Sequence, residues 1–197
     1  MSAQIDLPSL VGSRLCHDLI GPIGAIGNGV ELMLLPGNGR SDEIALIAES
    51  VAALTARIRF YRIAFGLSHG DQMISRSEVL SILSELHPSG RIVITWSTPA
   101  DLPRAEVKAT FLLLLCAEQG LRSTGRVHVL RDGTGWTMSL ASPRLDLSDG
   151  PLARLTALDP PEVGPAEVHF PLALQAIAGL GRTLRLEKGA ESLLISF

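Results

Sequence analysis

The segment best suited to chemistry is built around one histidine. It reads Leu-Cys-His17-Asp18-Leu-Ile-Gly-Pro22 and continues Ile-Gly-Ala-Ile-Gly-Asn-Gly-Val-Glu-Leu-Met. Inside a helix each glycine costs roughly 1 kcal/mol relative to alanine, and an interior proline about 3 kcal/mol. A helix that keeps four glycines and a proline usually needs the close approach of another surface or a local kink. The alternative is that the segment is a loop.

His17 lies two residues from both Leu15 and Leu19, so in a helix it points away from the apolar stripe to which they belong. The small or polar residues expected on its face are Arg14, Gly21, Gly24 and Asn28. Such a strip would let another protein come close to the imidazole. A lone surface histidine is more often merely solvated, so position alone does not establish a function.

Two long helices must position this histidine. Apolar residues recur every three or four positions in two stripes, which are Leu7, Val11, Leu15, Leu19, Ile23, Ile26, Val30 and Met33, and then Ile44, Ile47, Val51, Leu54, Ile58, Tyr61 and Phe65. Residues 35–40 hold a proline and two glycines and predict a turn. Ser41 is the expected N-cap of the second helix.

A short connection makes these helices an antiparallel hairpin. One hairpin leaves the flanks of both stripes in water, whereas two hairpins in a four-helix bundle cover them. We therefore expect a homodimer. The alternative is that the hairpin packs on the rest of its own chain.

Beyond residue 70 the pattern changes to alternating helices and strands. We expect helices at 77–87, 106–122 and 168–180, strands at 91–96, 125–131, 136–141, 183–187 and 192–197, and an irregular segment at 143–167. This order predicts an α+β fold, with one sheet covered by helices on one face. The expected domains are a hairpin at 1–70 and an α/β sandwich at 71–197.

Composition excludes several function classes. A net charge of −3 gives no basic footprint for nucleic acid. Residues 111–117, the longest apolar run, are too short to cross a bilayer, and the first residues lack a signal-peptide pattern. Cys16 and Cys116 show no metal-ligand spacing, and the other histidines, His69, His87, His128 and His169, are isolated in sequence. We expect a cytoplasmic protein that binds no metal, membrane or nucleic acid.

The stretch from His17 to Pro22 resembles the phosphoacceptor motif of dimerising sensor histidine kinases. Its continuation to Met33 is similar to the ChpT-type bacterial histidine phosphotransferases, as is Arg-Ile-Ala-Phe-Gly at 62–66. The resemblance implies that the hairpin forms a dimeric four-helix bundle and that a degenerate histidine-kinase-like (GHKL) α/β sandwich follows it.

The second domain should therefore retain a kinase scaffold without its nucleotide site. Leu112 and Cys116 stand where a kinase has asparagines for Mg²⁺, and neither is a ligand for a hard cation. Asp132-Gly-Thr-Gly135 lies in a tight hairpin, with no helix N-terminus following it to hold a phosphate. We expect no ATP-dependent autokinase activity.

The resemblance implies a phosphotransferase in which His17 takes a phosphoryl group from the receiver of a hybrid histidine kinase and passes it to the receivers of response regulators. The receivers would supply Mg²⁺, and this chain would bind no cofactor. The resemblance also implies that Asp18 holds the second ring nitrogen, although a solvated acid is the alternative. The expected receiver-binding residues are Arg14, Gly21, Gly24, Asn28, Arg59 and Arg62; residue 17 lies level with about residue 60 in such a hairpin.

Three other functions are alternatives to phosphotransfer through His17. An active ATP-dependent kinase would bind Mg-ATP, and a non-catalytic dimerisation or adaptor module would not need His17. A Cys16–His17 hydrolase is excluded, because adjacent side chains on a helix diverge by about 100° and cannot act as nucleophile and base.

Overall fold

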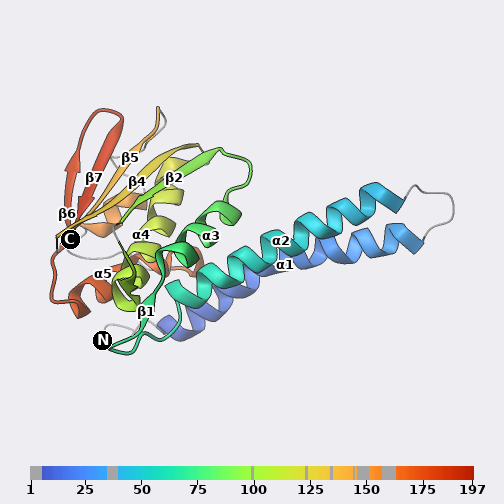
Figure 1. Cartoon of the computed structure of the whole chain (residues 1–197), viewed down its shortest axis with the longest axis horizontal. Coiled ribbons are helices and arrows are strands. Elements are labelled where there is room, and N and C mark those ends of the chain that lie inside the picture. The colour runs from blue at the N-terminus through green and yellow to red at the C-terminus, as the bar shows by residue number, and fades with distance from the viewer. Residues whose placement is uncertain are drawn as a thin grey trace.

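The computed structural model describes residues 6–34, 40–98, 100–122, 124–133, 135–143, 145, 151–156 and 163–197. Two long helices project from a body of sheet and shorter helices (Figure 1). Helix α1 spans Leu7–Leu34 and runs through Pro22, and helix α2 spans Arg40–Ala64 beside it. The two apolar stripes thus predicted the hairpin correctly, and the loop alternative for the segment around His17 was wrong.

One detail of the hairpin differs from the expectation. Helix α2 already begins at Arg40, so Ser41 lies inside the helix and is not its N-cap. The Ser41 hydroxyl instead lies 3.3 Å from a carboxylate oxygen of Asp42. The predicted turn lies almost wholly outside the described residues.

The body contains a mixed five-stranded sheet. Across it lie β2 (Ile92–Ser97), β4 (Gly125–Asp132), β5 (Gly135–Ala141), β7 (Ser192–Ser196) and β6 (Arg185–Lys188). The β2–β4 pair is parallel and the other pairs are antiparallel. A separate two-stranded pair joins β1 (Met73–Ile74) to β3 (Leu102–Pro103). The α+β prediction and both strand hairpins are confirmed.

Three helices cover one face of this sheet (Figure 1). They are α3 (Arg76–Leu86), α4 (Arg104–Leu121) and α5 (His169–Gly179), with single 3₁₀ turns η1 (Pro151–Leu155) and η2 (Pro165–Glu167) before α5. Ser75 caps α3 by accepting a hydrogen bond from the backbone N–H of Glu78. The apolar run in α4 is buried almost all round, as expected of a central helix.

The end of α2 belongs to the core of the body. Phe60, Ile63 and Ala64 are fully buried in the same cluster as the α4 side chains. The rings of Phe60 and Phe111 stack with centroids 4.5 Å apart. The hairpin thus packs on its own chain at its base, which was the alternative to packing only against a second copy.

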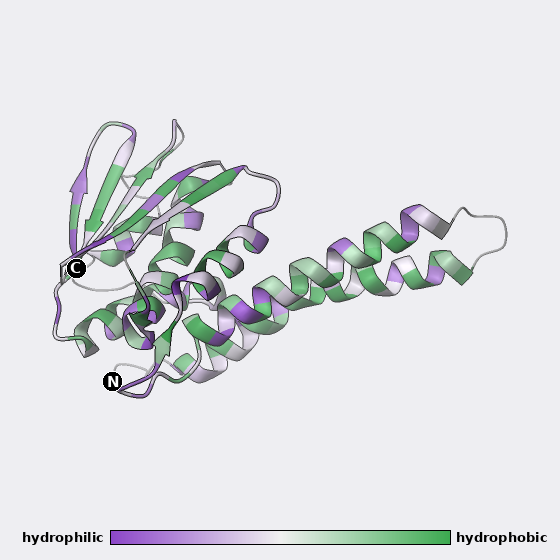
Figure 2. Cartoon of the chain, in the orientation of Figure 1, coloured by the Kyte–Doolittle hydropathy of each residue, from purple (hydrophilic) through white to green (hydrophobic). Residues whose placement is uncertain are grey.

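Farther from the body the hairpin keeps its apolar residues in solvent. Green hydrophobic residues run along both helices of the projecting arm (Figure 2). The exposed ones include Ile23, Val30, Ile44, Val51 and Ile58, each 46–54% accessible. Within the part of the chain described here, no helix combines the length and apolarity needed to cross a membrane.

Candidate functional site

The imidazole of His17 stands on the outside of α1. Its side chain is 85% exposed, as its position off the apolar stripe predicted. Nδ1 lies 3.1 Å from Oδ1 of Asp18, and among the described residues Nε2 has no hydrogen-bond partner. An ionised carboxylate carries no proton, so Nδ1 must be the donor in this contact. The neutral ring then has its lone pair on Nε2, the atom that a visiting molecule can reach.

Asp18 is the centre of a small hydrogen-bond network. Its side chain is only 10% exposed, and its Oδ2 accepts from Nε of Arg14 at 2.5 Å and from the hydroxyl of Tyr61. Burial alone would raise the pKa of Asp18, but the hydrogen bonds from Tyr61, His17 and Arg14 lower it below its ordinary value. Asp18 is therefore a partly buried, ionised acceptor, and the alternative of a solvated helix acid is wrong.

Tyr61 reaches this network from α2. The residue is 7% exposed, and its ring packs against Phe60 and Phe65. Burial, and then the hydrogen bond to Asp18, raise the pKa of Tyr61 well above its usual value, so the phenol stays protonated and donates. The sequence assigned Tyr61 only to the apolar stripe. The rise per residue, which sets residue 17 level with about residue 60, is the signal that could have found it.

Arg14 joins the hairpin to the body. Besides its bond to Asp18, it donates from Nη1 to the carbonyl oxygen of Ala166 in η2 at 2.6 Å. Nε2 of Gln119 in α4 donates to the same oxygen, also at 2.6 Å. Arg14 does lie beside the histidine segment, but its guanidinium is 17% exposed and engaged within the chain. Nothing in the sequence indicated the contact with Ala166.

The strip next to His17 is open. Gly21, Gly24 and Asn28 are exposed on α1. A Cβ added at Gly21 or Gly24 would meet no atom within 4 Å. The structure thus brings these three residues to the same exposed helix as His17, as expected, with open space at both glycines.

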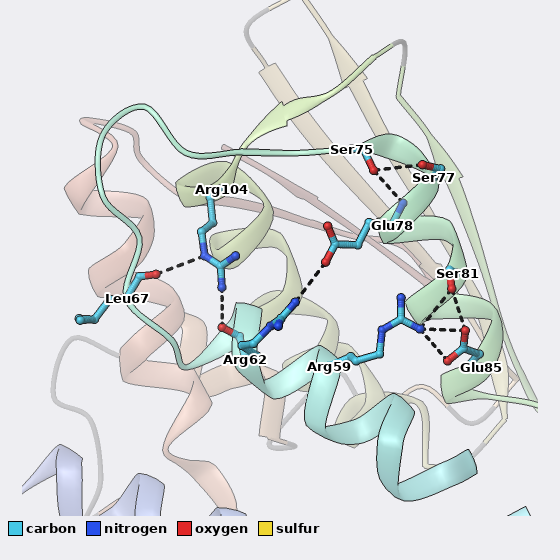
Figure 3. Close-up of polar contacts among 9 residues, drawn as sticks. All are labelled: Arg59, Arg62, Leu67, Ser75, Ser77, Glu78, Ser81, Glu85 and Arg104. Carbon is cyan, nitrogen blue, oxygen red and sulfur yellow. Dashed lines mark hydrogen bonds and ion pairs between the residues drawn. The ribbon is translucent and has the colours of Figure 1, made fainter.

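Arg59 and Arg62 face helix α3 instead (Figure 3). Nη1 of Arg59 lies 2.9 Å from both carboxylate oxygens of Glu85, and Nη2 of Arg62 lies 3.4 Å from Oε1 of Glu78. These contacts tie α2 to the body and do not group the two arginines with His17. Receiver binding by Arg59 and Arg62 stays a prediction.

Cationic side chains of α4 donate to carbonyls at the end of α2 and just after it. Arg104 donates from Nη2 to the carbonyl of Arg62 at 2.7 Å and from Nε to that of Leu67 at 3.2 Å (Figure 3). Lys108 donates to the carbonyl of Gly66 at 2.9 Å. Charged side chains thus donate to one carbonyl in the last turn of α2 and to two in the segment that follows it.

A second histidine lies buried near the network. His169, the first residue of α5, is 0% exposed, and neither ring nitrogen has a hydrogen-bond partner among the described residues. Burial lowers its pKa to about 3; Arg14 lowers it further, whereas Asp18 opposes the shift. His169 is thus a neutral packing residue at neutral pH.

The two residues at the positions of the kinase asparagines are part of the hydrophobic core. Leu112 and Cys116 are fully buried, and burial raises the pKa of the Cys116 thiol well above its usual value. A neutral, buried thiol and a leucine offer no oxygen ligand to Mg²⁺. Within the described ranges, no three His, Cys, Asp or Glu side chains cluster closely enough to hold a metal ion.

An exposed histidine on a helical hairpin, beside a partly buried acid and joined to an α+β body, suits a protein that carries a group on its imidazole. Residues 76–192 match the family described as the histidine phosphotransferase C-terminal domain. The chain belongs to the histidine phosphotransferase family, and its relatives are of the ChpT type.

The protein phosphotransferase ChpT of Brucella abortus (strain 2308) is 36% identical over 135 residues, which cover 67% of this chain. The aligned part spans 64% of the Brucella protein, which is less than two thirds of its length. A solved structure of a bacterial phosphotransferase superposes with a TM-score of 0.82 at 27% identity, covering 100% of this chain and 97% of the other. The whole α+β fold, hairpin included, is therefore that of a known phosphotransferase structure.

Proposed function

We propose that the protein relays phosphoryl groups between receiver domains of a two-component phosphorelay through phosphohistidine at His17. The observation that carries this proposal is the geometry of the His17 ring, which is 85% exposed while Asp18 occupies Nδ1. Phosphoryl transfer needs an in-line nucleophile and charge neutralisation more than covalent help from the protein. An accessible Nε2 lone pair is the nucleophile that the reaction needs.

In the forward step, Nε2 of neutral His17 attacks the phosphorus of an aspartyl phosphate on the first receiver. The N–P bond forms as the P–O bond to the aspartate breaks, and the aspartate leaves as a carboxylate. The proton on Nδ1 stays between the ring and Asp18, whose negative charge stabilises the positive ring. The reverse sequence, with the aspartate of a second receiver as nucleophile, returns His17 to its starting state.

The proposed partners are the receivers of a hybrid histidine kinase and of response regulators, which would supply Mg²⁺ to the transferring oxygens. The exposed strip at Gly21, Gly24 and Asn28 supports this, because small side chains allow a receiver to bring its aspartate close to Nε2. The core-filling Leu112 and Cys116 support transfer without ATP. We place this relay in the cytoplasm.

We also propose that the protein acts as a homodimer through the projecting arm. Ile44, Val51 and Ile58 are exposed at intervals of seven residues on α2, and Ile23 and Val30 at the same interval on α1. Exposed apolar residues with this spacing are typical of a helical-bundle seam. A second hairpin is the partner that would cover both rows.

The experiment that tests the relay uses an isolated receiver domain labelled with ³²P-acetyl phosphate. We expect the full chain to take up an acid-labile, base-stable label that maps to His17. His17→Gln should take up none, and the control His69→Gln, a change at another exposed histidine, should match the wild type. Label on His17→Gln would refute His17 as the phosphoacceptor, and no label on the wild type would refute the relay and favour an adaptor role.

A further inference from the structure

We infer that Tyr61 is a positioning residue for phosphotransfer, because its hydroxyl holds Asp18 so that Nδ1 of His17 is bound and Nε2 is presented outward. This inference rests on the proposed role of His17 and adds to it a residue from the other helix. Tyr61 would not touch the phosphoryl group. It would act through Asp18.

The argument begins with the two oxygens of the Asp18 carboxylate. Oδ2 is occupied by the Tyr61 hydroxyl and by Nε of Arg14, and Oδ1 faces Nδ1 of His17. With Oδ2 fixed by donors on two sides, the carboxylate cannot turn without breaking a charge-assisted hydrogen bond. Its other oxygen, Oδ1, therefore stays beside Nδ1 of the histidine ring.

Tyr61 is the donor that is held by aromatic packing. Its ring centroid lies 6.1 Å from that of Phe60 and 5.2 Å from that of Phe65, and the residue is 7% exposed. Its contacts with two aromatic rings restrict the phenol, and Arg14 is held by a second bond, to the carbonyl oxygen of Ala166. Tyr61 thus fixes where Oδ2 lies, and Arg14 adds charge.

The Tyr61 hydroxyl is also protonated, and therefore a donor, near neutral pH. Burial, and then the bond to Asp18, raise the pKa of Tyr61, so no deprotonation interrupts the contact near neutral pH. A protonated phenol facing an ionised carboxylate can only donate. The chain Tyr61–Asp18–His17 therefore has one proton arrangement, in which the neutral His17 ring carries its proton on Nδ1.

The test compares Tyr61→Phe, which removes the hydroxyl but keeps the packed ring, with the control Ser84→Ala. Ser84 is an exposed α3 residue whose hydroxyl donates to the carbonyl of Ser81. The first readout is the ¹⁵N shifts of the His17 ring in unphosphorylated full chain at about pH 8.5, where an ordinary imidazole is neutral. We expect an unprotonated Nε2 in the wild type and in Ser84→Ala, and a mixture of both tautomers in Tyr61→Phe.

The second readout is the rate of transfer from a phosphorylated receiver. Losing a hydrogen bond to a charged group should slow transfer about tenfold in Tyr61→Phe. In Asp18→Asn the added Tyr61→Phe change should have no further effect, because Tyr61 acts only through Asp18. A structural role alone would leave the tautomer unchanged and make the two effects multiply.

The two proposals fail differently in these experiments. A wild type that takes up no phosphoryl group refutes the relay, whatever the ring tautomer is. A wild-type tautomer in Tyr61→Phe, or multiplied losses in the double variant, overturns the role of Tyr61 while leaving the relay intact.

Discussion

Arg14 of α1 donates to the carbonyl oxygen of Ala166, which lies 152 residues later in the chain, at 2.6 Å. The same guanidinium donates to Asp18, next to the exposed histidine. One side chain thus joins the histidine segment to the loop before α5, and Gln119 holds the shared carbonyl from α4. The body therefore takes part in setting the height and rotation of α1 at His17.

Alanine at Gly21 or Gly24 should stabilise the protein and slow transfer. Neither new Cβ meets an atom within 4 Å, so the helix gains about 1 kcal/mol of propensity. The added methyl stands on the strip where a receiver would dock, and we expect transfer to fall several-fold. Urea unfolding and transfer kinetics measure the two effects. Gly12→Ala, equally open but on another side of α1, should stabilise without slowing transfer; equal transfer rates in all three variants would contradict the docking strip.

A charge on the exposed row of α2 should separate the dimer. Val51 is 46% exposed between Ile44 and Ile58, and Val51→Glu would place a carboxylate in the apolar seam. Sedimentation should give twice the 21.0 kDa chain mass for the wild type and the single mass for Val51→Glu. The control Ala53→Glu, exposed and two residues along the helix, should remain dimeric. A monomeric wild type would remove the dimer from the proposal.

Glu106 should be among the costliest polar residues to replace. It accepts from Nε of Arg131 at 2.8 Å, from the Trp136 indole at 2.7 Å and from Arg182 at 3.2 Å. Glu106→Gln would leave two guanidinium groups without their counter-charge, and we expect a loss of about 3 kcal/mol in the free energy of unfolding. Urea titration measures it against Glu187→Gln, an exposed change expected to stay within about 0.5 kcal/mol.

The contribution of Glu106 to the free energy of unfolding depends on pH. Burial alone would raise its pKa, but Arg131 and Trp136 lower it below the ordinary value of 4.5. The stability it contributes is therefore present above pH 4.5 and is lost as the pH falls through the lowered pKa. Glu106→Gln should accordingly lose less stability than the wild type in that acid range, and equal losses would be inconsistent with this account.

His169 should weaken the protein at mildly acidic pH. Its ring takes a proton near pH 6.5 in the unfolded chain but only near pH 3 when folded. Its contribution is thus complete above pH 6.5 and falls below it, because the unfolded state binds the extra proton. At about pH 5 the loss is about 2 kcal/mol. Replacing it by Phe should remove this part of the pH slope in urea titrations, whereas His69→Gln should not; identical slopes would contradict the prediction.

The sequence could predict elements whose signal is local. The apolar periodicity from Leu7 to Phe65 defined both long helices, and the offset of His17 from Leu15 and Leu19 defined its exposed face. The turn chemistry around Gly133 indicated the β4–β5 hairpin. These features depend on neighbours three or four residues apart, or on a tight turn.

Contacts set by tertiary packing could not be predicted in the same way. The Asp18–Tyr61 bond joins residues 43 positions apart, and Arg59 finds Glu85 only because α3 packs along α2. The parallel pairing of β2 with β4 likewise depends on the crossover through α4. The rise per residue predicts that Arg59 and Arg62 lie level with His17 along the hairpin. It does not predict the direction of their long side chains, which turn toward α3.

The contacts of Arg104 and Lys108 at the end of α2 limit whether the hairpin that carries His17 could be transferred to another protein. Arg104 and Lys108 donate to carbonyls at and just after the end of α2, and Phe60 stacks on Phe111 of α4 within the core of the body. An arm cut away before α3 would lose its terminal hydrogen bonds and expose an aromatic surface to water. Helices α1 and α2 thus do not form an independent unit. Recombination that transfers them to another protein must also transfer α4 or replace its contacts.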